Sequence, residues 1–290
     1  MYDIKFSKIS GRWNKKEYYI MRKLGGGGVG DVYLASCSRG LMAIKMSRDM
    51  LSITKEYNWM KKYKGRNYVP AVYELDDFES KGCIYHFFTM EYIEGYDLGK
   101  VINKNMSMKL RLQLFAIILK IIWDINKEGL IYSDLKQENI MVDKKNKSIR
   151  LIDFGSVTEV GLGIKEYTPI YDRAYWGLGK RLADSSYQTF SATILLISLL
   201  LGRKIDPRKD NIEDMINSLN KSRVPKEIID LIEKCIEGRI DNCGVFYDEL
   251  IKLSYAKPGK TNKFDTILYF IMIVLLILLG VLILIFMTTY

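Results

Sequence analysis

Two patterns of apolar residues divide the chain near residue 94. Before that point, short runs rich in tyrosine, valine and isoleucine alternate with turn residues, which is typical of β-strands. One helical segment, at about residues 49–64, interrupts these runs. The first part of the chain therefore predicts a small β-sheet with one helix. The expected strands are Tyr18–Gly25, Asp31–Cys37, Leu41–Met46, Val72–Leu75 and Cys83–Tyr92.

Helices dominate after residue 94. Apolar residues recur at three- and four-residue steps from Leu110 to Ile125, which is the spacing of an amphipathic helix. Ser107 can cap the start of this helix. The apolar run Ile194–Leu201 is too short to cross a bilayer and predicts a buried helix. We therefore expect a larger helical lobe after the sheet.

A longer apolar run lies near the end of the sequence. Ile267–Met287 contains 21 residues without a charge, and as a helix it would span about 31 Å, close to one hydrocarbon core. Lysines between residues 257 and 263 precede it, and the first residues of the chain contain no apolar stretch typical of a signal peptide. We expect a juxtamembrane linker at 256–266, a single transmembrane helix at 267–287, and residues 1–265 in the cytoplasm at the cell membrane.

Charge and composition narrow the partners and the chemistry. The formal net charge of +10 favours anionic partners such as nucleotides, acidic lipid headgroups or nucleic acid. His86 is the only histidine, which argues against a histidine-containing catalytic triad and against a metal site built from several imidazoles. The four cysteines contain no C-x-x-C pair and favour a reducing compartment.

A glycine-rich stretch is the first candidate for chemistry. Gly25, Gly27 and Gly30 give the spacing G-x-G-x-x-G, in which the backbone can close over a phosphate and offer its N–H groups. A plain hairpin turn and a dinucleotide-binding turn share this spacing. The dinucleotide-binding turn should open a helix, whereas strand-like sequence flanks this stretch on both sides. No G-K-[ST] follows, which excludes a P-loop.

Lys45 lies in the apolar run Ala43-Ile44-Lys45. A lysine buried there needs an anion, either a phosphate or a carboxylate. Glu56, on the following helical segment, is the best candidate carboxylate. For each residue taken alone, a solvated side chain is the alternative.

Two short loops beside apolar strands hold the other polar candidates. The sequence I-Y-S-D-L-K-Q-E-N-I-M-V contains Asp134, Lys136 and Asn139, and the sequence L-I-D-F-G contains Asp153. This set suits phosphoryl transfer. One carboxylate accepts a hydroxyl proton, another carboxylate and an amide oxygen hold Mg²⁺, and the lysine offsets charge on the transferred group.

Over roughly residues 15–255 the chain resembles a eukaryotic-type (Hanks-type) serine/threonine protein kinase of bacterial style. The ordered set G-x-G-x-x-G-x-V, A-I-K, a helix glutamate, D-L-K-x-x-N and D-F-G is complete. The resemblance implies a bilobal α+β fold. Its small antiparallel-sheet N-lobe and hinge would occupy residues 1–93, and its mostly helical C-lobe residues 94–255, ahead of the transmembrane helix.

The resemblance also implies residue roles, with ATP and Mg²⁺ as cofactors. Lys45 would contact the α- and β-phosphates and pair with Glu56. Asp134 would be the catalytic base, and Lys136 would touch the γ-phosphate. The peptide substrate would dock at T-P-I-Y, residues 168–171. Asn139 and Asp153 would ligate Mg²⁺. The nucleotide-binding residues would be Leu24, Gly25, Gly27, Gly30, Val32, Ala43 and Lys45 with the hinge residues Met90, Glu91 and Ile93.

Three family features are absent. The family's H-R-D is Tyr132-Ser133-Asp134 here, and the missing arginine normally reads a phosphate on the activation loop, so we expect that phosphorylation there is not an on-switch. The A-P-E triplet falls on R-A-Y at 173–175, and its arginine partner falls near Asn242 or Cys243. Loss of both ends of such an ion pair can be nearly neutral. Gln188 replaces an aspartate of the central helix and can still accept a hydrogen bond.

The sequence thus predicts a membrane-anchored kinase that transfers the γ-phosphoryl group of ATP to serine or threonine hydroxyls of proteins. Two alternatives keep the fold: a phosphotransferase acting on small molecules, and a catalytically weakened pseudokinase that serves as a scaffold. Further candidate partners are a second copy of the chain, through the membrane span, and DNA or anionic lipid, through the basic surface.

Overall fold

The computed structural model describes residues 7–102 and 106–255 of the 290-residue chain. The described residues up to Leu250 form one compact unit, and a second unit starts at Ile251, within helix α7 (Cys243–Tyr255). In the described part of the chain, no helix is long and apolar enough to cross a membrane. The predicted linker at 256–266 and the predicted transmembrane helix at 267–287 lie outside it.

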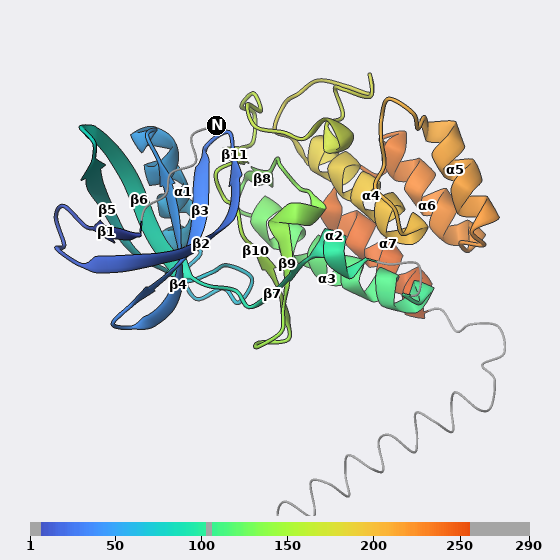
Figure 1. Ribbon diagram of the computed structural model, residues 1–290. Helices are drawn as coiled ribbons and strands as arrows, with labels where there is room; N and C mark the ends of the chain where they lie inside the picture. Colours follow the sequence, from blue (N-terminus) through green and yellow to red (C-terminus); the bar gives the residue numbers. More distant parts are fainter. Residues whose placement is uncertain (1–6, 103–105, 256–290) are drawn as a thin grey trace, which may run out of the picture. The chain divides into compact units, whose positions relative to one another are not determined.

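The first lobe is a six-stranded antiparallel sheet with the strand order β1-β2-β3-β4-β6-β5 (Figure 1). Five of its strands match the five predicted ones, although β5 runs on to Ser80. Strand β1 was not predicted, because three residues show too little alternation to stand out from the background. The strands are β1 (Lys8–Ser10), β2 (Glu17–Gly27), β3 (Gly30–Cys37), β4 (Gly40–Ser47), β5 (Val72–Ser80) and β6 (Cys83–Glu91).

Helix α1 (Met50–Lys62) packs against β4, β5 and β6. The Asp49 side chain caps it by accepting hydrogen bonds from the backbone N–H groups of Leu51 and Ser52. The cap fixes where the helix starts. As a result Glu56 is completely buried, on the side of the helix that faces the sheet.

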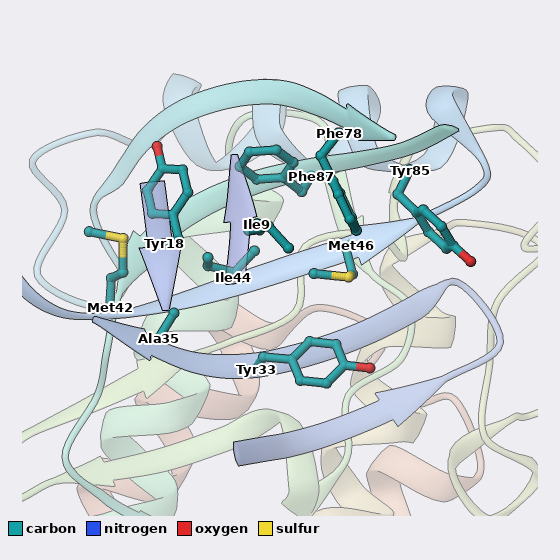
Figure 2. Close-up of a cluster of buried hydrophobic side chains, with 10 residues drawn as sticks. All are labelled: Ile9, Tyr18, Tyr33, Ala35, Met42, Ile44, Met46, Phe78, Tyr85 and Phe87. Atoms are coloured by element: carbon teal, nitrogen blue, oxygen red, sulfur yellow. The ribbon is translucent and has the colours of Figure 1, made fainter. Parts of the chain in front are cut away.

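Alternation along β4 separates the core of this lobe from the candidate site. Met42, Ile44 and Met46 belong to one buried hydrophobic cluster, drawn in Figure 2. The residues between them, Ala43 and Lys45, project from the opposite face of the strand. Both line a large cavity. The period of two therefore places a lysine in the cleft while its neighbours hold the sheet together.

The second lobe is mostly helical, as the sequence predicts. Helix α3 starts after Ser107, whose hydroxyl accepts a hydrogen bond from the Leu110 N–H at 3.3 Å. Helix α4 contains the predicted buried run and ends at Gly202, whose φ of 63° lies in the left-handed region that favours glycine. The helices are α2 (Leu98–Val101), α3 (Met108–Asn126), α4 (Ser185–Leu201), α5 (Ile212–Lys221), α6 (Lys226–Ile236) and α7.

Short strand pairs hold the loops that carry the polar candidates. Asp134 follows β8, and Asp153 lies between β10 and β11. Because β8 pairs with β11, the segments around these two aspartates are held next to each other. The short strands are β7 (Gly95–Asp97), β8 (Leu130–Tyr132), β9 (Ile140–Asp143), β10 (Ser148–Leu151) and β11 (Val157–Glu159).

Candidate active site

One cavity of about 780 Å³ collects nearly all of the predicted site residues. Glu56 is the exception, because it lies behind Lys45 and is not exposed. The cavity is lined by Leu24, Gly25, Gly27, Gly30, Val32, Ala43, Lys45, Met90, Glu91, Ile93, Asp134, Lys136, Asn139 and Asp153. These residues are spread over more than a hundred positions of sequence, and the fold brings them to one place.

The glycine-rich stretch forms the tip of a hairpin between β2 and β3. Gly25 pairs with Val32, and Gly27 pairs with Gly30. A Cβ at Gly30 would lie 2.4 Å from the backbone oxygen of Met46, so only glycine fits this close approach. A Cβ at Gly25 or Gly27 would meet nothing within 4 Å. The backbone of the hairpin is thus open on its cleft side and can approach a phosphate.

Lys45 holds two carboxylates together. Its Nζ lies 2.6 Å from Glu56 Oε2 and 3.4 Å from Asp153 Oδ1. Burial lowers the pKa of Lys45, but Glu56 and Asp153 outweigh it and raise that pKa overall. Burial, helped by the nearby Asp153, raises the pKa of Glu56 to about 7. The pKa of Asp153 is lowered, because Lys45 and the Gly155 N–H outweigh the effect of burial. Asp153 is therefore an anion at neutral pH.

Asp134 lies at the centre of a hydrogen-bond network. Its Oδ1 accepts a hydrogen bond from Thr168 Oγ1 at 2.7 Å, and its Oδ2 accepts bonds from Lys136 Nζ and from Asn139 Nδ2. Asn139 Nδ2 also donates to the Asp134 backbone oxygen at 3.0 Å. Because these bonds use the amide nitrogen of Asn139, its amide oxygen is the atom left for a cation.

Uncharged residues anchor the loop before Asp134. Ser133 Oγ donates to the backbone oxygens of Ser156, at 2.5 Å, and Glu166, at 3.2 Å. Gln188 Oε1 accepts a hydrogen bond from the Tyr132 N–H at 2.7 Å, and its Nε2 donates to the Tyr132 backbone oxygen at 3.3 Å. The predicted hydrogen-bonding role of Gln188 is thus present, and Ser133 ties together the two ends of the segment that follows Asp153.

A local ion pair lies where the A-P-E triplet was expected. Asp172 is fully buried, and its Oδ2 accepts hydrogen bonds from Arg181 Nε at 3.0 Å and from an Arg181 terminal nitrogen at 2.6 Å. The Arg181 guanidinium also lies 3.8 Å from the centre of the Tyr167 ring. Tyr167 precedes Thr168, the donor to Asp134. The Asp172–Arg181 pair therefore supports the segment that contains Thr168, which contacts Asp134.

The hinge carries a second unpredicted anchor. Arg150, which is buried on β10, donates to both carboxylate oxygens of Glu91, to Asp143 Oδ2 at 3.1 Å and to the Val69 backbone oxygen at 3.1 Å. The carboxylate of Glu91, a residue that lines the cavity, is therefore held by Arg150. This network ties the hinge to the strand that leads to Asp153.

Several cavity residues were missed by the sequence reasoning. Met141 and Ile152 add apolar surface, and each lies within two residues of a motif residue, so the short apolar runs around Asn139 and Asp153 could have indicated them. Glu166 also lines the cavity, and burial raises its pKa. No pattern in the sequence distinguishes Glu166 from an ordinary loop glutamate.

This arrangement is that of a protein kinase domain. It combines an antiparallel-sheet lobe with a glycine hairpin, a buried lysine–glutamate pair and two aspartates in facing loops. The comparisons agree with this class. Residues 18–242 match the family described as "Protein kinase domain". Because the match covers most of the chain, the chain belongs to the protein kinase family.

Two curated relatives come from Bacillus subtilis. The chain is 37% identical over 195 residues to the serine/threonine-protein kinase YabT, an alignment that covers 66% of this chain and 57% of YabT. It is 28% identical over 214 residues to the serine/threonine-protein kinase PrkC, covering 68% of this chain and 31% of PrkC. The chain thus matches just over half of the first relative and about a third of the second.

A solved structure shares the fold. The granulovirus kinase PK-1 of Cydia pomonella granulovirus superposes with a TM-score of 0.61 at 18% identity, over 81% of this chain and 92% of that chain. At this level of identity the likeness shows the fold alone.

Proposed function

We propose that this chain is an ATP- and Mg²⁺-dependent serine/threonine protein kinase. The observation that carries the proposal is the convergence of Lys45, Asp134, Asn139 and Asp153 in one cavity. The named relatives are serine/threonine kinases, which supports the same acceptor class. A scaffold would have no need for all of these polar groups in one cleft.

The donor set suits Mg²⁺. The Asp153 carboxylate, kept ionised by Lys45, and the Asn139 amide oxygen are the hard oxygen ligands that this ion prefers. Among the described residues, no group of three or more His, Cys, Asp or Glu side chains could hold a metal ion. Mg²⁺ is commonly held by one or two protein ligands together with substrate phosphates and water. When bound, the ion neutralises charge that develops on the phosphates.

The remaining groups bind, orient and move a proton. Lys45 Nζ contacts the phosphates, and Glu56 keeps it in place. Asp134 Oδ2 accepts the proton of the acceptor hydroxyl, while Thr168 fixes the orientation of the carboxylate through Oδ1. Lys136, next to Asp134, balances charge on the transferred group.

Labelled ATP and a generic protein substrate test the proposal. We expect labelled phosphoserine or phosphothreonine with the native chain and none with Asp153→Ala. Label found only in small molecules would favour the small-molecule phosphotransferase. ATP-dependent thermal stabilisation without any turnover would favour the pseudokinase scaffold.

We further propose a membrane anchor at 267–287, with the kinase domain in the cytoplasm at the cell membrane. The argument rests on the uncharged 21-residue run and on the lysines that precede it. Membrane fractionation of the full chain, and of a chain ending at residue 260, tests it. Recovery of both in the soluble fraction would contradict the anchor. Self-association through this segment, and binding of DNA or anionic lipid by the basic surface, stay predictions of the sequence.

Phosphorylation of the segment after Asp153 is not expected to switch the enzyme on. The residue before Asp134 is the uncharged Ser133, whose hydroxyl is already bonded to backbone, and Ser156 is buried. Thr158→Val should keep activity within about threefold of the native chain, because it removes one bond from a partly exposed hydroxyl. Activity before and after phosphatase treatment is the measurement. A loss of more than tenfold in either case would contradict the expectation.

Arg150→Met is expected to weaken nucleotide binding. The change leaves Glu91 and Asp143 without their shared cation and frees the hinge to move. We expect the KM for ATP to rise roughly tenfold, the equivalent of one lost hydrogen bond to a charged group, while the KM for a peptide stays the same. Lys145→Met, an exposed lysine on the same β-hairpin, is the matched control. An unchanged KM for ATP in Arg150→Met would rule out the hinge anchor.

A further inference from the structure

A basic strip borders the segment that carries Thr168. Gly161–Ile164 runs antiparallel to Arg181–Ala183, with hydrogen bonds from the Ile164 N–H to the Arg181 backbone oxygen and from the Ala183 N–H to the Leu162 backbone oxygen. Lys165 follows the first of these segments and Lys180 precedes the second, so the two lysines lie at the same end of the paired segments. Both lysines are exposed. We define these two residues as the basic strip.

The strip is held in a fixed position. Ile164, directly before Lys165, is buried in a hydrophobic cluster with Ile131, Ala183 and Tyr187. Arg181, directly after Lys180, is fixed by Asp172 and stacks on Tyr167. The backbone on both sides is thus anchored, and the two lysine side chains are left at the surface.

The strip carries charge that its surroundings do not neutralise. In the part of the chain that the structure describes, neither Lys165 nor Lys180 forms an ion pair. Like charges on neighbouring exposed side chains repel each other. An anion that binds near both lysines relieves this repulsion.

Nearby carboxylates do not cancel this charge. Asp172 is buried against Arg181, and Asp184 pairs with Arg173 at 3.0 Å. Glu138, at the mouth of the cavity, pairs with Lys204. Glu166 points inward, with Oε2 3.7 Å from the place of a Cβ on Gly155. The surface presented beside Thr168 is therefore positive.

We propose that the basic strip selects protein substrates with acidic residues next to the phosphorylated serine or threonine. This inference rests on the proposed kinase function and names its substrate class. Lys165 is three residues from Thr168, which lies 2.7 Å from Asp134. An acceptor hydroxyl at Asp134 therefore brings the flanking residues of its own chain over the strip. Complementary charge at the edge of a binding site affects the specificity and the association rate of the substrate more than its affinity.

Three peptides that differ only in their flanks test the proposal. Each has one threonine, flanked by glutamates, by lysines or by glutamines. We expect kcat/KM for the acidic peptide to exceed that for the basic peptide roughly tenfold. Each of the two exposed lysines attracts a glutamate flank and repels a lysine flank, and exposed charge contacts are individually weak. The double variant Lys165→Glu, Lys180→Glu should reverse the order. Lys221→Glu, an exposed lysine on α5, is the matched control and should keep it. Equal rates for all three peptides would overturn the proposal.

Peptide binding without ATP separates this proposal from the kinase function. Fluorescence anisotropy should show tighter binding of the acidic peptide to the native chain than to the double variant. That result together with no phosphorylation would contradict the kinase function and support the strip. Binding that is equal in the two proteins would overturn the strip. A DNA oligonucleotide whose binding alone depends on the two lysines would also overturn it, since the partner would then be nucleic acid.

Discussion

Asp134→Asn is expected to slow phosphoryl transfer about 10²- to 10⁴-fold, the usual contribution of a general base. The amide has the shape of the carboxylate and can still accept a hydrogen bond from Thr168, which lies 2.7 Å away in the native chain. It cannot accept the proton of an acceptor hydroxyl. It also removes the anion next to Lys136, whose ammonium then loses its partner in the resting site.

The expected signature is a loss in kcat with little change in nucleotide affinity. Lys45, Glu56 and Asp153 are untouched by the change, so thermal stabilisation by ATP with Mg²⁺ should match that of the native chain. Asp241→Asn, on an exposed loop residue, serves as the control for the loss of one negative charge. Activity of Asp134→Asn within tenfold of the native value would show that Asp134 is not the base.

The motif residues could be predicted because each depends on its local sequence. Alternation along residues 41–46 indicates a strand, and its period of two puts Ala43 and Lys45 on one face. The capping role of Ser107 likewise depends only on the residues that directly follow it. The small sheet and the helical lobe after it followed from such local patterns, and the protein kinase fold with its antiparallel sheet followed from the resemblance that the ordered motifs carry.

The anchors of the site could not be predicted, because they join residues whose pairing only the fold decides. Arg150 and Glu91 are 59 positions apart, and nothing near either residue indicates the other. The sequence suggested that both ends of the A-P-E ion pair were lost. It did not reveal that Asp172 and Arg181 form a different pair in the same region. Each of these pairs depends on the direction in which its side chains point. In irregular loops, the alternation of apolar and polar residues does not predict that direction.

Asp172 is the anchor whose loss should cost the most stability. It is fully buried, and besides Arg181 it accepts hydrogen bonds from the backbone N–H groups of Ala174, at 3.4 Å, and Tyr175, at 3.2 Å. A carboxylate so placed organises the turn after the 3₁₀ segment Pro169–Tyr171. Removal of the carboxylate leaves these donors without an acceptor. Loss of one partner of a buried pair destabilises the fold more than loss of both.

Asp172→Ala is therefore expected to lower the free energy of unfolding by about 3 kcal/mol, the low end for breaking a buried pair, because Arg181 is partly exposed and can turn to water. In a domain of this size that corresponds to a fall in Tm of roughly 6–12 °C. Asp206→Ala, which breaks the exposed pair with Arg208, should lower Tm much less. Below the new Tm, the KM for a protein substrate should rise while ATP binding persists, because Tyr167 and Thr168 lose the support of Arg181, whereas the glycine hairpin, Lys45 and the hinge do not. An unchanged Tm and an unchanged substrate KM together would mean that the A-P-E triplet has no replacement here and that the segment is held by Ile164 and its hydrophobic neighbours instead.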